Sequence, residues 1–96
     1  MDIREFQEHI RTLYAGRDKE RGLDRTMLWL VEEVGELAEA VRQDDKVKLE
    51  EELADVVAWA ASVANVTGLD LDAILRKKYG ATCHYCRQNP CACTKK

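Results

Sequence analysis

The chain has 96 residues, which is enough for one domain with a small hydrophobic core. Its formal net charge of −3 argues against a general affinity for nucleic acid, and its N-terminus lacks the apolar run of a signal peptide. The longest uncharged run, residues 56–69, is too short to cross a bilayer, because a spanning helix needs about 20 apolar residues. We therefore expect a cytoplasmic protein that has neither nucleic acid nor a membrane as its partner.

Apolar residues recur at helical spacing along most of the chain and predict an all-α fold. Helices are expected over residues 2–15, 25–43, 46–66 and 71–79, with a polar loop at 16–23. The turn between the second and third helices is short, so these two helices should be antiparallel neighbours. The third helix is apolar on more than one side, which indicates burial against a second subunit.

The predicted loop contains Arg17, Lys19 and Arg21, and Arg25 follows it closely. A solvated basic loop is one interpretation. The other is that one or more of these residues contact substrate phosphates, because the Arg guanidinium is well suited to phosphate; Arg25 is our candidate. Lys78, at the end of the last helix, is a second candidate, although the helix dipole alone favours a cation there.

The acidity of the chain is concentrated in residues 32–55, where ten Asp and Glu face three Lys and Arg for a net charge of −7. Glu33 and Glu36 form an E-x-x-E pair, and Glu52 and Asp55 form an E-x-x-D pair. Residues three apart share a helix face, so a helical hairpin would bring the four carboxylates together. Such carboxylates raise one another's pKa unless a cation neutralises them, and an oxygen-only ligand set favours Mg²⁺.

The tail, residues 80–96, breaks the helical pattern and contains C-x2-C followed by C-x-C. A reducing compartment favours a metal site over disulfides for such a cluster. Four thiolates would bind a structural Zn²⁺ and leave no open position for water. The alternative is a thiol-rich tail that binds nothing. The predicted zinc ligands are Cys83, Cys86, Cys91 and Cys93.

Two segments, EEVGELAEA at 32–40 and EELADVVAWA at 51–60, resemble the MazG-type nucleoside triphosphate pyrophosphohydrolases of the all-α NTP pyrophosphatase superfamily. The resemblance covers about residues 1–79, our predicted catalytic domain, and implies a helical bundle completed by dimerisation, sometimes as a dimer of dimers. It also implies hydrolysis of an NTP or dNTP to the monophosphate and pyrophosphate, possible nucleotide-pool sanitation, and a need for Mg²⁺, with Mn²⁺ as a substitute. Carried over by position, the implied metal ligands are Glu33, Glu36, Glu52 and Asp55, with Glu32 as the residue that orients or deprotonates the attacking water.

Three alternatives remain at this point. A phosphoribosyl-ATP pyrophosphatase or a dUTP- or dCTP-specific enzyme of the same superfamily would share the chemistry and differ in the pocket. A di-iron bundle is disfavoured, because such sites use E-x-x-H motifs and the second pair here is E-x-x-D. A non-catalytic helical interaction module with a zinc-stapled tail would leave the acidic face solvated.

Overall fold

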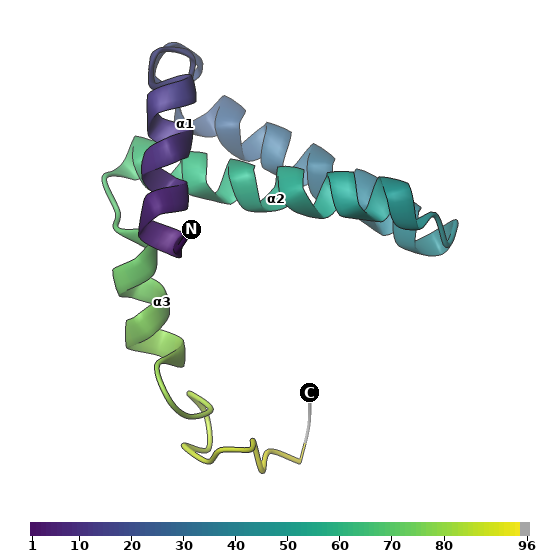
Figure 1. The fold of residues 1–96 in the computed structure, drawn as a ribbon, viewed down its shortest axis with the longest axis vertical. Helices are drawn as coiled ribbons and strands as arrows, with labels where there is room; N and C mark the ends of the chain where they lie inside the picture. The colour runs from purple at the N-terminus through teal and green to yellow at the C-terminus, as the bar shows by residue number, and fades with distance from the viewer. Residues whose placement is uncertain (95–96) are drawn as a thin grey trace.

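The computed structural model describes residues 1–94, in which three helices are followed by an irregular tail (Figure 1). The helices are α1 (Ile3–Arg42), α2 (Lys46–Thr67) and α3 (Leu71–Tyr79). These 94 residues contain no β-strand, so the predicted all-α class is confirmed. Nor does this part of the chain hold any helix with the length and apolar character that a membrane span requires.

A single break interrupts α1 at Gly22, whose φ of 82° and ψ of 170° are not helical. This backbone conformation is open almost only to glycine. The chain changes direction there: the segment before Gly22 crosses α2, and the segment after it runs beside α2 (Figure 1). The predicted loop at 16–23 is therefore wrong in extent. Gly16 reads as a loop signal but lies within the helix, and the non-helical backbone is at Gly22.

The segment of α1 after Gly22 and the whole of α2 form the predicted antiparallel hairpin, joined by the turn at 43–45 (Figure 1). Asp45 caps α2 by accepting a hydrogen bond from the Lys48 backbone N–H at 3.1 Å. Gly68 ends α2 with a left-handed φ of 73°, and its N–H donates to the carbonyl of Ala64. The short turn places residues 33–36 opposite residues 52–55, which positions the acidic pairs.

Gln7 fixes the N-terminal segment of α1 to the other end of the hairpin. Its side chain is 4% exposed and donates to Asn65 Oδ1 at 2.9 Å and to the carbonyl of Leu69 at 2.8 Å. Its Oε1 accepts from the Leu71 backbone N–H at 2.8 Å. A buried amide with all these partners specifies one position for the segment, because any shift would leave polar atoms unpaired.

The hydrophobic core is small: within residues 1–94, the fully buried apolar residues are Ile10, Ala40, Ala61 and Ala64. Many large apolar side chains along the hairpin stay exposed instead. They include Met27, Leu28, Trp29, Val31, Val34, Val41, Val47, Leu53 and Val57. Exposed apolar surface on this scale is unusual for a protein that acts as a single copy.

Candidate functional site

Three of the four predicted carboxylates meet between the two helices of the hairpin. Glu33 and Glu36 come from α1 and Glu52 from α2, and one oxygen of each lies within 4.8 Å of the others. We call these three residues the carboxylate cluster. Asp55 lies outside this limit, one turn along α2, although it is near enough for its charge to act on Glu33 and Glu52. The hairpin thus produces the predicted convergence, with Asp55 at its edge.

The carboxylate cluster lacks compensating charge from the protein. Glu33 and Glu52 each have one oxygen that is enclosed and receives no hydrogen bond from any described residue. None of the ion pairs in residues 1–94 involves a member of the cluster. A buried carboxylate with neither a donor nor a counter-ion is costly, so the arrangement favours a cation or a proton.

The raised pKa values of two members of the cluster show this preference for a proton. Burial raises the pKa of Glu33 to about 7, helped by a hydrogen bond with Glu52 and by the charges of Glu36 and Asp55. For Glu52 the largest effect, the hydrogen bond with Glu33, lowers the pKa, but burial, Glu36 and Asp55 together raise it above its ordinary value. Without a cation, Glu33 is therefore only partly ionised at neutral pH. An oxygen-only ligand set of this kind fits a hard divalent cation in place of that proton.

A pocket of about 270 Å³ adjoins the carboxylate cluster at Asp55. We call it the Asp55 pocket, and its lining residues are Ile10, Tyr14, Arg17, Asp18, Arg21, Asp55, Ala58, Trp59 and Ser62. They come from two places: α2, and the segment of α1 before Gly22. Asp55 thus links the two features, since it belongs to the pocket wall and its charge acts on Glu33 and Glu52.

The wall of the Asp55 pocket combines ionic and aromatic groups. The Arg21 guanidinium lies 4.7 Å from the centroid of the Trp59 ring and donates to Asp18 Oδ1 at 2.7 Å. Arg21 also donates to the fully buried Thr26 hydroxyl at 3.4 Å. Trp59 stacks on Trp29 with ring centroids 6.2 Å apart. Arg21 is thus held in place by three neighbours.

Sequence reasoning found part of this wall. Arg17 and Arg21 belong to the basic stretch with a suggested phosphate role, and Asp55 to the acidic pair on α2. It missed Tyr14 and Asp18. Nothing in the sequence marks these two residues as functional, since their positions depend on the direction that the chain takes at Gly22.

The remaining predicted residues lie elsewhere. Glu32 is exposed beside Glu33 and is not a member of the carboxylate cluster. Arg25 is exposed and does not line the Asp55 pocket. Lys78 lines a separate basic hollow where α3 meets the tail, beside Arg76 and Arg87. The catalytic role of Glu32 and the phosphate contacts of Arg25 and Lys78 stay predictions.

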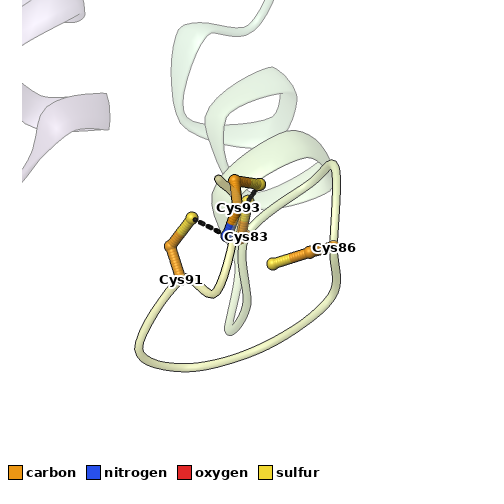
Figure 2. Close-up of side chains that lie close together, drawn as sticks. All are labelled: Cys83, Cys86, Cys91 and Cys93. Atoms are coloured by element: carbon orange, nitrogen blue, oxygen red, sulfur yellow. Dashed lines mark hydrogen bonds between the residues drawn. The ribbon is translucent and has the colours of Figure 1, made fainter. Parts of the chain in front are cut away.

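The four cysteines of the tail form a second cluster (Figure 2). Their Sγ atoms all lie within 4.8 Å of one another, and none is in a disulfide. Cys83 and Cys93 Sγ are 3.7 Å apart, and the Cys93 backbone N–H donates to Cys91 Sγ at 3.3 Å. Four sulfur atoms gathered in this way match the ligand set of a tetrahedral zinc site.

The ionisation of these thiols is uneven. Backbone N–H groups of Cys86 and Tyr85 lower the pKa of Cys83 to about 6. The pKa of Cys86 is also lowered, first by the backbone N–H of Ala92. The side chains of Cys91, Cys83 and Cys86 raise the pKa of Cys93 to about 12. The loop thus favours thiolates but cannot ionise all four without a cation.

Comparison with known proteins gives one positive result. A family model described as the MazG nucleotide pyrophosphohydrolase domain matches residues 21–80, which include the whole carboxylate cluster and Asp55. No curated protein matches the chain. The match begins just before the break at Gly22, so most of the first segment of α1 and nearly all of the tail lie outside it.

The raised pKa of Glu33 predicts a pH dependence of stability for the metal-free protein. Its ordinary value is 4.5, so between pH 4.5 and about 7 the folded chain binds more protons than the unfolded chain. This group's contribution to the free energy of unfolding should therefore fall as pH rises through that range. Glu33→Gln should remove that part of the fall. Urea unfolding with EDTA at pH 5 and pH 8 measures it, with the exposed Glu50→Gln as control. Equal pH dependence in all three proteins would contradict the raised pKa.

Proposed function

Because the chain belongs to the MazG nucleotide pyrophosphohydrolase domain family, we propose that it hydrolyses a nucleoside triphosphate, an NTP or a dNTP, to the monophosphate and pyrophosphate. The observation that supports this most directly is the carboxylate cluster, in which three acidic groups converge without a protein cation. Nucleotide-pool sanitation would be one use of this reaction.

The proposed ligands of a divalent cation are Glu33, Glu36, Glu52 and Asp55. Mg²⁺ fits the oxygen-only set, and Mn²⁺ would substitute. Asp55 has an exposed side chain on the same face of α2 as Glu52, which places it on the side of the helix that carries the cluster. When bound, the cation neutralises phosphate charge and makes water easier to deprotonate.

The chain's own residues would handle the proton of the attacking water. Water adds to the α- or the β-phosphorus, and the bond from that phosphorus to the α,β-bridging oxygen breaks. The electron pair of that bond stays on the bridging oxygen, which leaves as part of pyrophosphate or of the monophosphate. We assign Glu32 as the group that accepts the water's proton, because it is an exposed carboxylate that directly precedes Glu33 in the chain. Arg25 and Lys78 remain proposed phosphate contacts, whereas Arg17 and Arg21 already lie in the pocket wall.

The tail is proposed to bind a structural Zn²⁺ through Cys83, Cys86, Cys91 and Cys93. The close approach of the four Sγ atoms supports this ligand set. Four free thiols also suit a reducing compartment, which supports a cytoplasmic location. Since the cysteines fall outside the matched family segment, the tail would stabilise its own fold rather than take part in hydrolysis.

A second copy of the chain is the proposed cover of the exposed apolar residues on the hairpin. We expect a homodimer or a dimer of dimers, because one copy buries too little apolar surface to be stable alone. Sedimentation equilibrium at micromolar concentration measures the assembly state. Val57→Glu, on the exposed apolar side of α2, should shift the protein toward monomer, whereas Ala54→Glu, at an exposed small residue, should shift it less. A folded wild-type monomer would contradict the proposal.

For the tail, elemental analysis of protein purified under reducing conditions should give about one zinc ion per chain. Cys93→Ser should lower this content well below one, because a hydroxyl replaces a thiolate ligand. The matched control is Ala92→Ser, which places the same side chain at the exposed neighbouring position. Absence of zinc from the reduced wild type would leave the free-thiol interpretation.

For the reaction, wild-type protein with Mg²⁺ should release pyrophosphate from a panel of NTPs and dNTPs. Glu36→Gln should lower kcat/KM by at least about a hundredfold, since losing even an outer-shell partner of a metal commonly costs about 10- to 100-fold. Circular dichroism should show an unchanged helical fold, and Glu50→Gln is the control. Release from phosphoribosyl-ATP alone would indicate the related biosynthetic enzyme. No release from any of these substrates would favour the non-catalytic module.

A further inference from the structure

Asp18 is a buried acid that is only half partnered. Its exposed fraction is 4%, and its Oδ1 accepts from Arg21 at 2.7 Å. Its Oδ2 is enclosed and receives no hydrogen bond from any residue in the described range. An oxygen in this position is costly unless a donor reaches it. Asp18 lines both the Asp55 pocket and a neighbouring hollow beside Lys19 and Asn65, and a small rotation of its side chain would be needed to turn Oδ2 toward a donor group in the Asp55 pocket.

The surroundings of Asp18 suit a planar ligand. The Arg21 guanidinium lies over the Trp59 indole at 4.7 Å, too close for a base to enter between them, so the flat groups left for a base are the Arg21 guanidinium and the Tyr14 ring of the same wall. Aromatic rings and guanidinium planes stack on nucleobases in a way that tolerates any base. The hydrogen-bonding groups beside the stacking surface then select among bases.

The pocket also lies at a suitable place along α2. Glu52, Asp55, Trp59 and Ser62 recur three and four residues apart and so lie on one face of the helix. Glu52 belongs to the carboxylate cluster, and the other three line the Asp55 pocket. At about 1.5 Å per residue, Glu52 and Ser62 are about 15 Å apart along the helix. A nucleotide with its phosphates at the cluster would therefore extend its base into the pocket.

We propose that the Asp55 pocket is the base subsite and that Asp18 Oδ2 accepts a hydrogen bond from an exocyclic amino group of the base. This inference rests on the proposed function, since it uses the phosphates to orient the nucleotide. Cytosine and adenine present an amino group where uracil and hypoxanthine present a carbonyl oxygen. A carbonyl would set one acceptor against another and leave Oδ2 unpaired. Amino-bearing bases are therefore the preferred substrates.

The test compares substrates that differ at this group, dCTP with dUTP and ATP with ITP. The wild type should favour the amino-bearing member of each pair by about tenfold or more in kcat/KM, as expected when a buried acceptor is left unpaired. In Asp18→Asn the side-chain amide can donate to a carbonyl, so the ratio should fall toward one. Asp24→Asn makes the same chemical change at an exposed residue outside the pocket and should keep the wild-type ratio.

Equal turnover of both members of each pair by the wild type would overturn the inference while leaving the proposed function intact. A wild-type preference that persists in Asp18→Asn would overturn the role of Asp18. If no nucleotide releases pyrophosphate, the proposed function fails, and quenching of Trp fluorescence by dCTP and dUTP decides the inference separately. Tighter binding of dCTP that is lost in Asp18→Asn supports it, and equal binding of the two overturns it.

Discussion

The repulsion among Glu33, Glu36 and Glu52 is the constraint on which the site depends. The hairpin holds one oxygen of each within 4.8 Å of the others, although no ion pair among residues 1–94 compensates them. The packing of α1 against α2 imposes this arrangement, since Glu33 and Glu36 come from one helix and Glu52 from the other. The fold therefore carries an electrostatic cost that a proton offsets near neutral pH and that a divalent cation would offset more completely.

The hairpin and its acidic pairs were predictable from the sequence because both depend on local rules. Helical periodicity, a short turn and two pairs of acidic residues three apart are enough to place Glu33 and Glu36 opposite Glu52. The place of Asp55 was less predictable. It shares the correct helix face, but an exposed side chain one turn away is not fixed by spacing alone, and it lies at the edge of the cluster.

The Asp55 pocket could not be predicted, because its two walls come from segments whose relative placement depends on the backbone conformation at Gly22. Residues 16–21 look like a loop by composition, since they combine a glycine with charged side chains. In the structure they are helical, and Asp18 pairs there with Arg21, three residues further along the same helix. Tertiary contacts from Gln7 to Asn65 and Leu69 hold the segment in place, and such contacts have no sequence signal.

Gly22 also separates the residues of the site into two groups that an insertion or deletion in the sequence would affect differently. Asp18 and Arg21 lie before it, whereas Glu33 and Glu36 lie after it on the straight part of α1. Adding or removing one residue between Asp18 and Gly22 would rotate Asp18 by about 100° around its helix relative to the break. The register of Glu33 and Glu36 against α2 would not change. Changes in the segment before Gly22 can therefore alter the wall of the Asp55 pocket while the carboxylate cluster keeps its arrangement.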